Sequence, residues 1–148
     1  MDSTRITRDQ LFMVMAHAAA ERGTCNRLRV GAVLALESRP ISMGYNGAPS
    51  EMPHCGSDCN PSNPCRNTLH AERNALDWAL KHLGHFPAGC TLYVTDSPCM
   101  DCAEYILNAG VSRVVYDRDY RLTTGVDWLR KYGVEVEQCH VKLVINVS

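Results

Sequence analysis

The sequence predicts an α/β fold, in which helices cover the faces of a central sheet. Helical and strand-like segments alternate along the chain, and the strand-like segments are rich in small and branched apolar residues. The chain has 148 residues, 45% of them hydrophobic, which is enough for one ordinary domain with a real core. We therefore expect a single domain over residues 1–148.

The start of the chain predicts one helix and then a hairpin. Thr7 and Gln10 have the spacing of a capping box, and apolar residues recur at helical intervals from there to Gly23. Segments 29–37 and 40–46 are apolar enough for strands, and the turn "SRP" separates them. We expect these two strands to pair in antiparallel fashion.

The rest of the chain repeats helix and strand. The expected elements are a helix at 69–83, a strand at 90–96, a helix at 97–110, a strand at 111–116, a helix at 126–133 and a strand at 134–139. Gly84 and Gly110 are expected to end their helices. Ser97 is expected as the N-cap of the helix at 97–110, with Pro98 at its first helical position.

Composition argues against several classes of protein. Fifteen basic and sixteen acidic residues give a net charge of -1, so we expect no long nucleic acid and no anionic membrane as partner. The start "MDSTRITRDQ" lacks the apolar core of a secretory signal, and no later run has the length of a membrane span. These features predict a cytoplasmic protein, in the host cytoplasm if the chain is viral.

Two motifs indicate a metal centre, "HAE" at 70–72 and "PCMDC" at 98–102. Cys99 and Cys102 lie three positions apart at the start of a predicted helix, so their sulfurs can hold one ion, with His70 as a third ligand. Three protein ligands leave the fourth tetrahedral position of a zinc ion open, as a catalytic site requires. Glu72 is then the natural proton carrier.

The geometry of "HAE" adds one expectation. His70 and Glu72 would be about 200° apart on an ideal helix, so His70 is expected at the non-helical cap and Glu72 inside the first turn. A structural zinc ribbon, with His70 as a core histidine, is the alternative for a Cys-x-x-Cys pair. A non-catalytic zinc-binding module is therefore a competing function, although Glu72 argues against it.

The motifs resemble those of the deoxycytidylate deaminase family, within the cytidine and deoxycytidylate deaminase superfamily. The resemblance rests on "CNRLRVGAVL", "SMGYNGAPSEMPHC", "LHAERNAL" and "TLYVTDSPCMDCAEYILNAGVSRVVY". It implies a three-layer α-β-α sandwich around a mixed five-stranded sheet. It also implies zinc-dependent conversion of deoxycytidine monophosphate (dCMP) to deoxyuridine monophosphate (dUMP) and ammonia, which supplies dUMP for thymidylate synthesis.

The resemblance also implies residue roles. His70, Cys99 and Cys102 would bind zinc, and Glu72 would protonate N3 of the base and then the departing amine. The substrate-binding residues would be Arg27 at the 5′-phosphate, Asn46 at the sugar or base, Ala71 through its backbone, Ser97, and Tyr120 by stacking on the ring. Arg27 could instead be a solvated surface arginine, Asn46 a turn residue and Tyr120 a packing residue.

Assembly and regulation are implied in the same way. Family members are commonly hexamers, activated by deoxycytidine triphosphate (dCTP) and inhibited by thymidine triphosphate (dTTP), with the effector near Gly44, Asn46 and Gly47. The sequence leaves open whether dCMP or dCTP is the preferred substrate. Deamination of adenosine in transfer RNA or of a base in single-stranded DNA is a further alternative.

The remaining cysteines fall into two groups. Four of Cys25, His54, Cys55, Cys59 and Cys65 would close a second, structural zinc site and anchor a loop that has few apolar residues. Free thiols in a surface loop are the alternative. Cys90 and Cys139 lie at the ends of expected strands and are expected to be buried or half-buried thiols.

Overall fold

The computed structural model describes residues 5–25, 28–47, 69–120 and 122–142. Its elements are α1 Arg8–Ala20, β1 Gly31–Leu36, β2 Arg39–Tyr45, α2 Ala71–Leu83, β3 Thr91–Asp96, α3 Met100–Asn108, β4 Arg113–Arg118, α4 Thr124–Lys131 and β5 Glu135–Gln138. The predicted alternation of elements is therefore confirmed. None of the helices in these ranges is long and apolar enough to cross a membrane.

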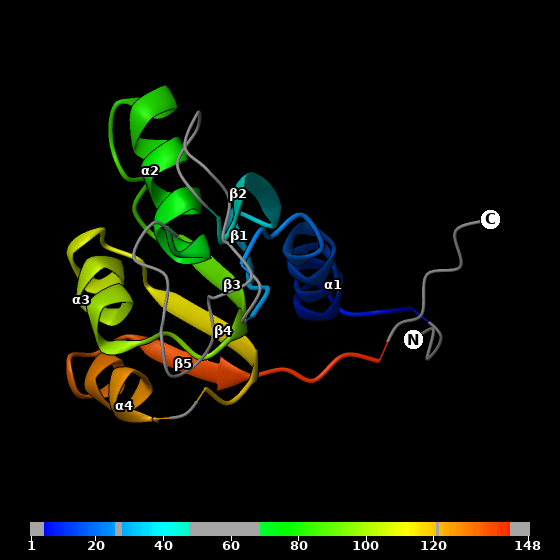
Figure 1. Cartoon of the computed structure of the whole chain (residues 1–148). Coiled ribbons are helices and arrows are strands. Elements are labelled where there is room, and N and C mark those ends of the chain that lie inside the picture. The colour runs from blue at the N-terminus through cyan, green and yellow to red at the C-terminus, as the bar shows by residue number, and fades with distance from the viewer. Residues whose placement is uncertain (1–4, 26–27, 48–68, 121, 143–148) are drawn as a thin grey trace.

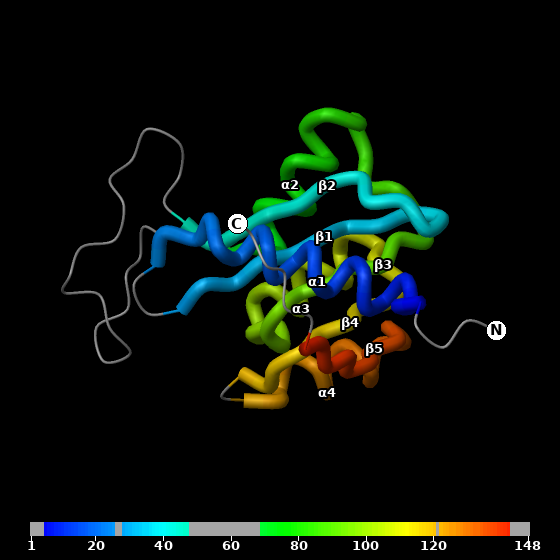
Figure 2. The backbone as a smooth tube through the Cα atoms, turned by 90° about the vertical axis from the view of Figure 1, so that its right-hand side faces the viewer, coloured from blue at the N-terminus to red at the C-terminus, as the bar shows by residue number. Residues whose placement is uncertain are grey.

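The strands form one mixed five-stranded sheet in the order β2-β1-β3-β4-β5. β1 pairs with β2 and with β3 in antiparallel fashion, whereas β3, β4 and β5 run parallel. α1 covers one face of this sheet, and α2, α3 and α4 cover the other (Figure 1). Figure 2 shows α1 running along the sheet beside β1. The three-layer α-β-α arrangement is confirmed.

The protein has two hydrophobic cores, one on each face of the sheet. They arise because successive side chains of a strand point to opposite faces. On β1, Ala32 and Leu34 belong to the larger core, which α2, α3 and α4 cover. Val33 and Ala35 belong to the smaller core, which lies against Phe12 and other residues of α1. β1 is therefore buried on both faces.

The start of α1 has the predicted capping box. The Thr7 hydroxyl accepts from the Gln10 amide at 3.1 Å, and the Gln10 side chain accepts from the Thr7 amide at 2.8 Å. The hairpin is also confirmed, but its turn lies at Glu37 and Ser38, with φ of 50° and 68°. Such a turn matches the twist of paired strands, so Arg39 already belongs to β2.

The predicted start of α3 is wrong by two residues. Cys99, in extended conformation, is the N-cap, and the first helical residue is Met100. The ring of Pro98 disfavours helical backbone at Ser97, whose amide instead donates to the Arg118 carbonyl at 2.8 Å. The Ser97 hydroxyl accepts from the Tyr120 amide at 2.6 Å, and it makes no cap contact with α3.

Candidate metal centre and pocket

The starts of α2 and α3 meet beside the carboxyl end of β3. His70 is the extended N-cap of α2, with φ -78° and ψ 148°, as its spacing from Glu72 predicted. Cys99 occupies the same position on α3, and Cys102 follows in the first turn. Because the positive ends of two helix dipoles point here, thiolates and other anions are stabilised at this place.

The three side chains predicted to bind metal lie together. Nδ1 of His70 is 3.1 Å from the Cys102 sulfur and 3.6 Å from the Cys99 sulfur. All three donor atoms lie within 4.8 Å of one another, and no fourth residue joins the group in the described part of the chain. A tetrahedral zinc ion with ordinary bond lengths needs nitrogen-sulfur separations of about 3.5 Å, so the donor set fits zinc.

The pKa values of the two thiols shift in opposite directions. The hydrogen bond from Cys102 lowers the pKa of Cys99 to about 4, and His70 contributes to the same shift. The same hydrogen bond and burial raise the pKa of Cys102. Cys99 is therefore already a thiolate at neutral pH, which is the form that binds metal.

Glu72 lies beside the metal-binding group on the first turn of α2. It is 5% exposed, and this burial raises the pKa of its carboxyl above the ordinary value. A carboxyl whose pKa moves toward neutrality is suited to take up and release a proton during a reaction. The geometry therefore provides a metal centre with an adjacent proton carrier.

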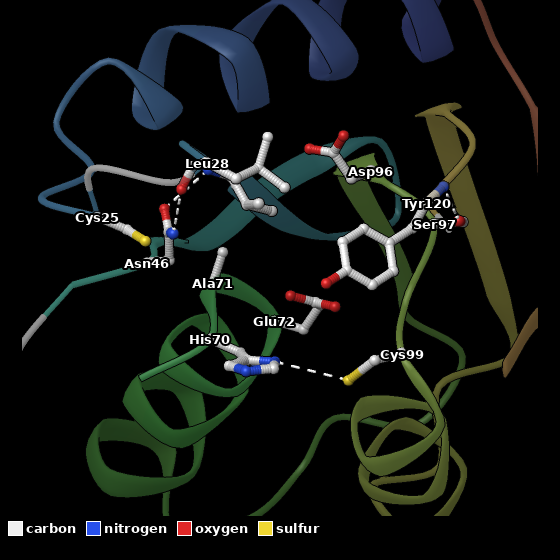
Figure 3. A pocket seen from close by; sticks show the side chains of 11 residues that line it. Cys25, Leu28, Asn46, His70, Ala71, Glu72, Asp96, Ser97, Cys99 and Tyr120 are labelled. Carbon is white, nitrogen blue, oxygen red and sulfur yellow. Dashed lines mark hydrogen bonds between the residues drawn. The ribbon is translucent and has the colours of Figure 1, made fainter. Parts of the chain in front are cut away.

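A pocket opens above this group. Figure 3 shows the Tyr120 ring reaching across it toward Glu72, with His70 and Cys99 on the other side of Glu72 and Leu28 and Asn46 at the opposite wall. The lining residues are Cys25, Leu28, Val30, Asn46, His70, Ala71, Glu72, Asp96, Ser97, Cys99 and Tyr120. The pocket thus joins the metal centre to the predicted substrate residues.

The family model for the cytidine and deoxycytidylate deaminase zinc-binding region matches residues 6–118. The chain belongs to the cytidine and deoxycytidylate deaminase family. The match covers most of the chain, and the metal-binding group of His70, Cys99 and Cys102 lies within it, as does Glu72.

Known deaminases are similar over most of this chain. ComE operon protein 2 of Bacillus subtilis is 37% identical over 144 residues, which are 95% of this chain and 76% of that protein. Deoxycytidylate deaminase of Saccharomyces cerevisiae is 36% identical over 141 residues, which are 88% of this chain but only 44% of the yeast enzyme. The dCMP deaminase of cyanophage S-TIM5, solved in complex with dCMP and dUMP, superposes with a TM-score of 0.78 at 33% identity. That match covers 94% of this chain and 99% of that one.

Asn46 stabilises one wall of the deaminase pocket through two side-chain hydrogen bonds. Its side-chain amide donates to the Leu28 carbonyl at 2.6 Å, and its side-chain oxygen accepts from the Val30 amide at 2.7 Å. Asn46 is 7% exposed, and both hydrogen bonds are partly buried. Asn46 therefore shapes the pocket wall, and its predicted contact with the sugar or base stays a prediction.

Gly44 lets the deaminase's α2 lie close to β2, and Gly47 lets the chain after β2 lie close to Thr24. A Cβ atom at Gly44 would lie 2.4 Å from the Ala71 carbonyl oxygen, and one at Gly47 would lie 2.8 Å from the Thr24 hydroxyl. Gly47 also exchanges two backbone hydrogen bonds with Leu69, at 3.1 and 2.7 Å. These contacts set the position of His70, and the predicted part of the glycines in effector binding stays a prediction.

Several predicted residues lie outside the described ranges, namely Arg27, His54, Cys55, Cys59 and Cys65. Of the second metal group only Cys25 is described, and it is buried at the pocket wall. Cys90 is buried and Cys139 half-buried, as predicted.

Leu28, Val30 and Asp96 also line the pocket, although the sequence pattern did not predict them there. Asp96 had a usable signal, because polar residues at the carboxyl ends of parallel strands often line binding sites. Leu28 and Val30 are ordinary apolar residues, and nothing in their spacing marks them.

Proposed function

We propose that this chain deaminates dCMP to dUMP and ammonia, and so provides dUMP for thymidylate synthesis. The observation that carries the proposal is the buried Glu72 beside His70, Cys99 and Cys102 at the floor of a pocket. The yeast and cyanophage relatives, both dCMP deaminases, support the choice of substrate.

The metal and Glu72 divide the chemistry. His70, Cys99 and Cys102 would hold the zinc, which would lower the pKa of a bound water molecule to about 7. Glu72 takes a proton from the attacking water and delivers it to N3 of the base as the water oxygen adds at C4. It then takes the proton left on the new C4 hydroxyl and delivers it to the departing amine, so that ammonia leaves and the C4 carbonyl forms. Its burial raises the pKa of the carboxyl, which suits it to both transfers.

The pocket walls position the nucleotide. The backbone at Ala71 holds the base, the Tyr120 ring covers its face, and Asn46 binds the sugar or base from the wall that it shapes. Arg27 binds the 5′-phosphate, for which a planar guanidinium is well suited.

The test measures ammonia release from the mono-, di- and triphosphates of deoxycytidine, a cytosine-containing DNA oligonucleotide and transfer RNA. We expect the zinc-loaded protein to turn over dCMP and Glu72→Ala to be inactive. Glu104→Ala, on the exposed side of α3, is the matched control and should be fully active. No turnover of free nucleotides would reject the proposal, and a preference for dCTP or a polynucleotide would correct the substrate.

We also propose a second, structural zinc bound by four of Cys25, His54, Cys55, Cys59 and Cys65. The donor chemistry and the burial of Cys25 support this site. Elemental analysis of protein purified without chelator should give about two zinc ions per chain. A value near one would reject the second site.

The chain is further proposed to form a homo-oligomer, a hexamer by family resemblance, with dCTP and dTTP as effectors. The edge strand β2 exposes Met43 by 56%, and α2 exposes Trp78 by 47%. Both line one hollow with Met15 and Ile41, and contiguous apolar surface of this kind favours association. Light scattering of the eluted protein would report the mass, and a monomer would contradict the assembly. Unchanged dCMP turnover with added dCTP and dTTP would contradict the regulation.

A further inference from the structure

The chain segment that carries Tyr120 is fastened to the segment that leads into Cys99. The Ser97 amide donates to the Arg118 carbonyl at 2.8 Å, and the Tyr120 amide donates to the Ser97 hydroxyl oxygen at 2.6 Å. A third contact joins the Arg118 guanidinium to the Asp96 carboxylate at 2.9 Å. The two segments are 20 or more positions apart in sequence and meet only because β3 and β4 are parallel neighbours.

Ser97 is the central member of these contacts. It is 4% exposed, and its backbone and its hydroxyl each hold one residue of the Tyr120 segment. The Asp96 contact is weaker, because the Arg118 side chain is half exposed and water screens the ion pair. The hydroxyl bond to the Tyr120 amide is therefore the main restraint on that residue's backbone.

We infer that Ser97 is a positioning residue of the deaminase, which sets the height of the Tyr120 ring over the pocket through the Tyr120 backbone. This inference rests on the proposed function, since the ring matters only if a base lies beneath it. It differs from the family expectation that Ser97 contacts the substrate itself. Figure 3 shows the hydroxyl directed at the Tyr120 amide.

The two roles differ in how they combine with a change at Tyr120. If Ser97 acts through the ring, Ser97→Ala removes an effect that exists only while the ring is present. The cost of Ser97→Ala should then disappear in a Tyr120→Ala background. If Ser97 contacts the substrate, the costs of the two changes should multiply.

The first measurement needs no turnover. Hydrogen exchange at the Tyr120 amide should be at least about tenfold faster in Ser97→Ala than in the unaltered protein, because its acceptor is gone. Ser112→Ala is the matched control, since the Ser112 hydroxyl also makes one backbone contact, to the Cys90 carbonyl at 3.1 Å. An unchanged exchange rate in Ser97→Ala overturns the inference whether or not the protein deaminates dCMP.

The second measurement is a double-mutant cycle on kcat/KM for dCMP. Ser97→Ala alone should lose about fivefold to tenfold, the value of one hydrogen bond. In the Tyr120→Ala background it should lose less than twofold. Ser97→Thr, which keeps an oxygen at this place, should recover most of the loss, and Ser112→Ala should change nothing. Multiplying losses would overturn the inference, whereas absent turnover in the unaltered protein would reject only the proposed function.

Discussion

Nδ1 of His70 lies 3.1 Å from the Cys102 sulfur, although 32 positions separate the two residues. The rest of the fold holds them at this distance, since His70 caps α2 and Cys102 lies in the first turn of α3. Metal binding therefore needs little rearrangement of the backbone.

Removal of one sulfur ligand should abolish both the metal and the activity. Cys102→Ala leaves two ligands, so the zinc content should fall by about one ion per chain and dCMP turnover should fall to background. The matched control is Cys90→Ala, which removes a thiol that is equally buried but lies outside the metal group. Elemental analysis measures the zinc content, and an ammonia assay measures the dCMP turnover. Full zinc content in Cys102→Ala would contradict the ligand assignment.

Glu72→Gln should separate proton transfer from metal binding. The amide fills the same buried space but cannot accept a proton, so we expect kcat to fall by at least about 100-fold. Zinc content should not change, because Glu72 is not a member of the metal group. Steady-state kinetics on zinc-quantified protein would test this, and a kcat within a few-fold of the unaltered enzyme would remove Glu72 from the mechanism.

Asn46→Ala should weaken the fold as well as the site. It leaves the half-buried Leu28 carbonyl and Val30 amide without their side-chain partner, which we expect to lower the free energy of unfolding by about 1 to 2 kcal/mol. Asn108→Ala, at an exposed position of α3, should cost much less. Urea denaturation of both variants measures the difference, and equal midpoints would show that Asn46 does not hold the wall.

Asp9 should make stability depend on pH. Two hydrogen bonds from the Arg113 guanidinium, at 2.9 and 2.7 Å, hold the pKa of Asp9 below its usual value. Because the folded pKa is depressed, the stabilisation is present at neutral pH and is lost as pH falls below about 4. Asp9→Asn should therefore lower the free energy of unfolding by about 1 kcal/mol at pH 7.

The pH series itself is the check on this prediction. The difference between the unaltered protein and Asp9→Asn should shrink as pH falls toward 3. Glu135→Gln is the control, because Glu135 is exposed and lies 4.0 Å from Arg113. A difference that stays constant from pH 7 to pH 3 would show that the Asp9 charge contributes nothing.

The metal centre could be predicted from sequence because each of its members lies at a helix start that local motifs reveal. The spacing within "HAE" also predicted the non-helical position of His70. His70 and Glu72 would lie on nearly opposite sides of an ideal helix, so both can face one metal only if His70 is outside the helix. The contact between Ser97 and Tyr120 could not be predicted in this way. By local pattern, Ser97 and Pro98 fit the start of a helix. Only the pairing of β3 with β4 brings the Tyr120 amide to the Ser97 hydroxyl, which therefore does not cap the helix.

The pocket wall was missed for a similar reason. Leu28 and Val30 line it because Asn46, on the far side of the hairpin, binds their backbone. Their side chains carry no chemical signature that a reading of local pattern could use. Asp96 likewise becomes a lining residue through its place at the end of β3.

The position of α1 by itself on the second face of the sheet has a practical consequence. No residue between Arg8 and Ala20 lines the catalytic pocket, yet this helix closes the smaller core. α1 thus contributes to stability without lining the pocket. Exposed positions of α1 away from Met15, such as Arg8, offer a place to label or immobilise the enzyme without altering the nucleotide that it accepts.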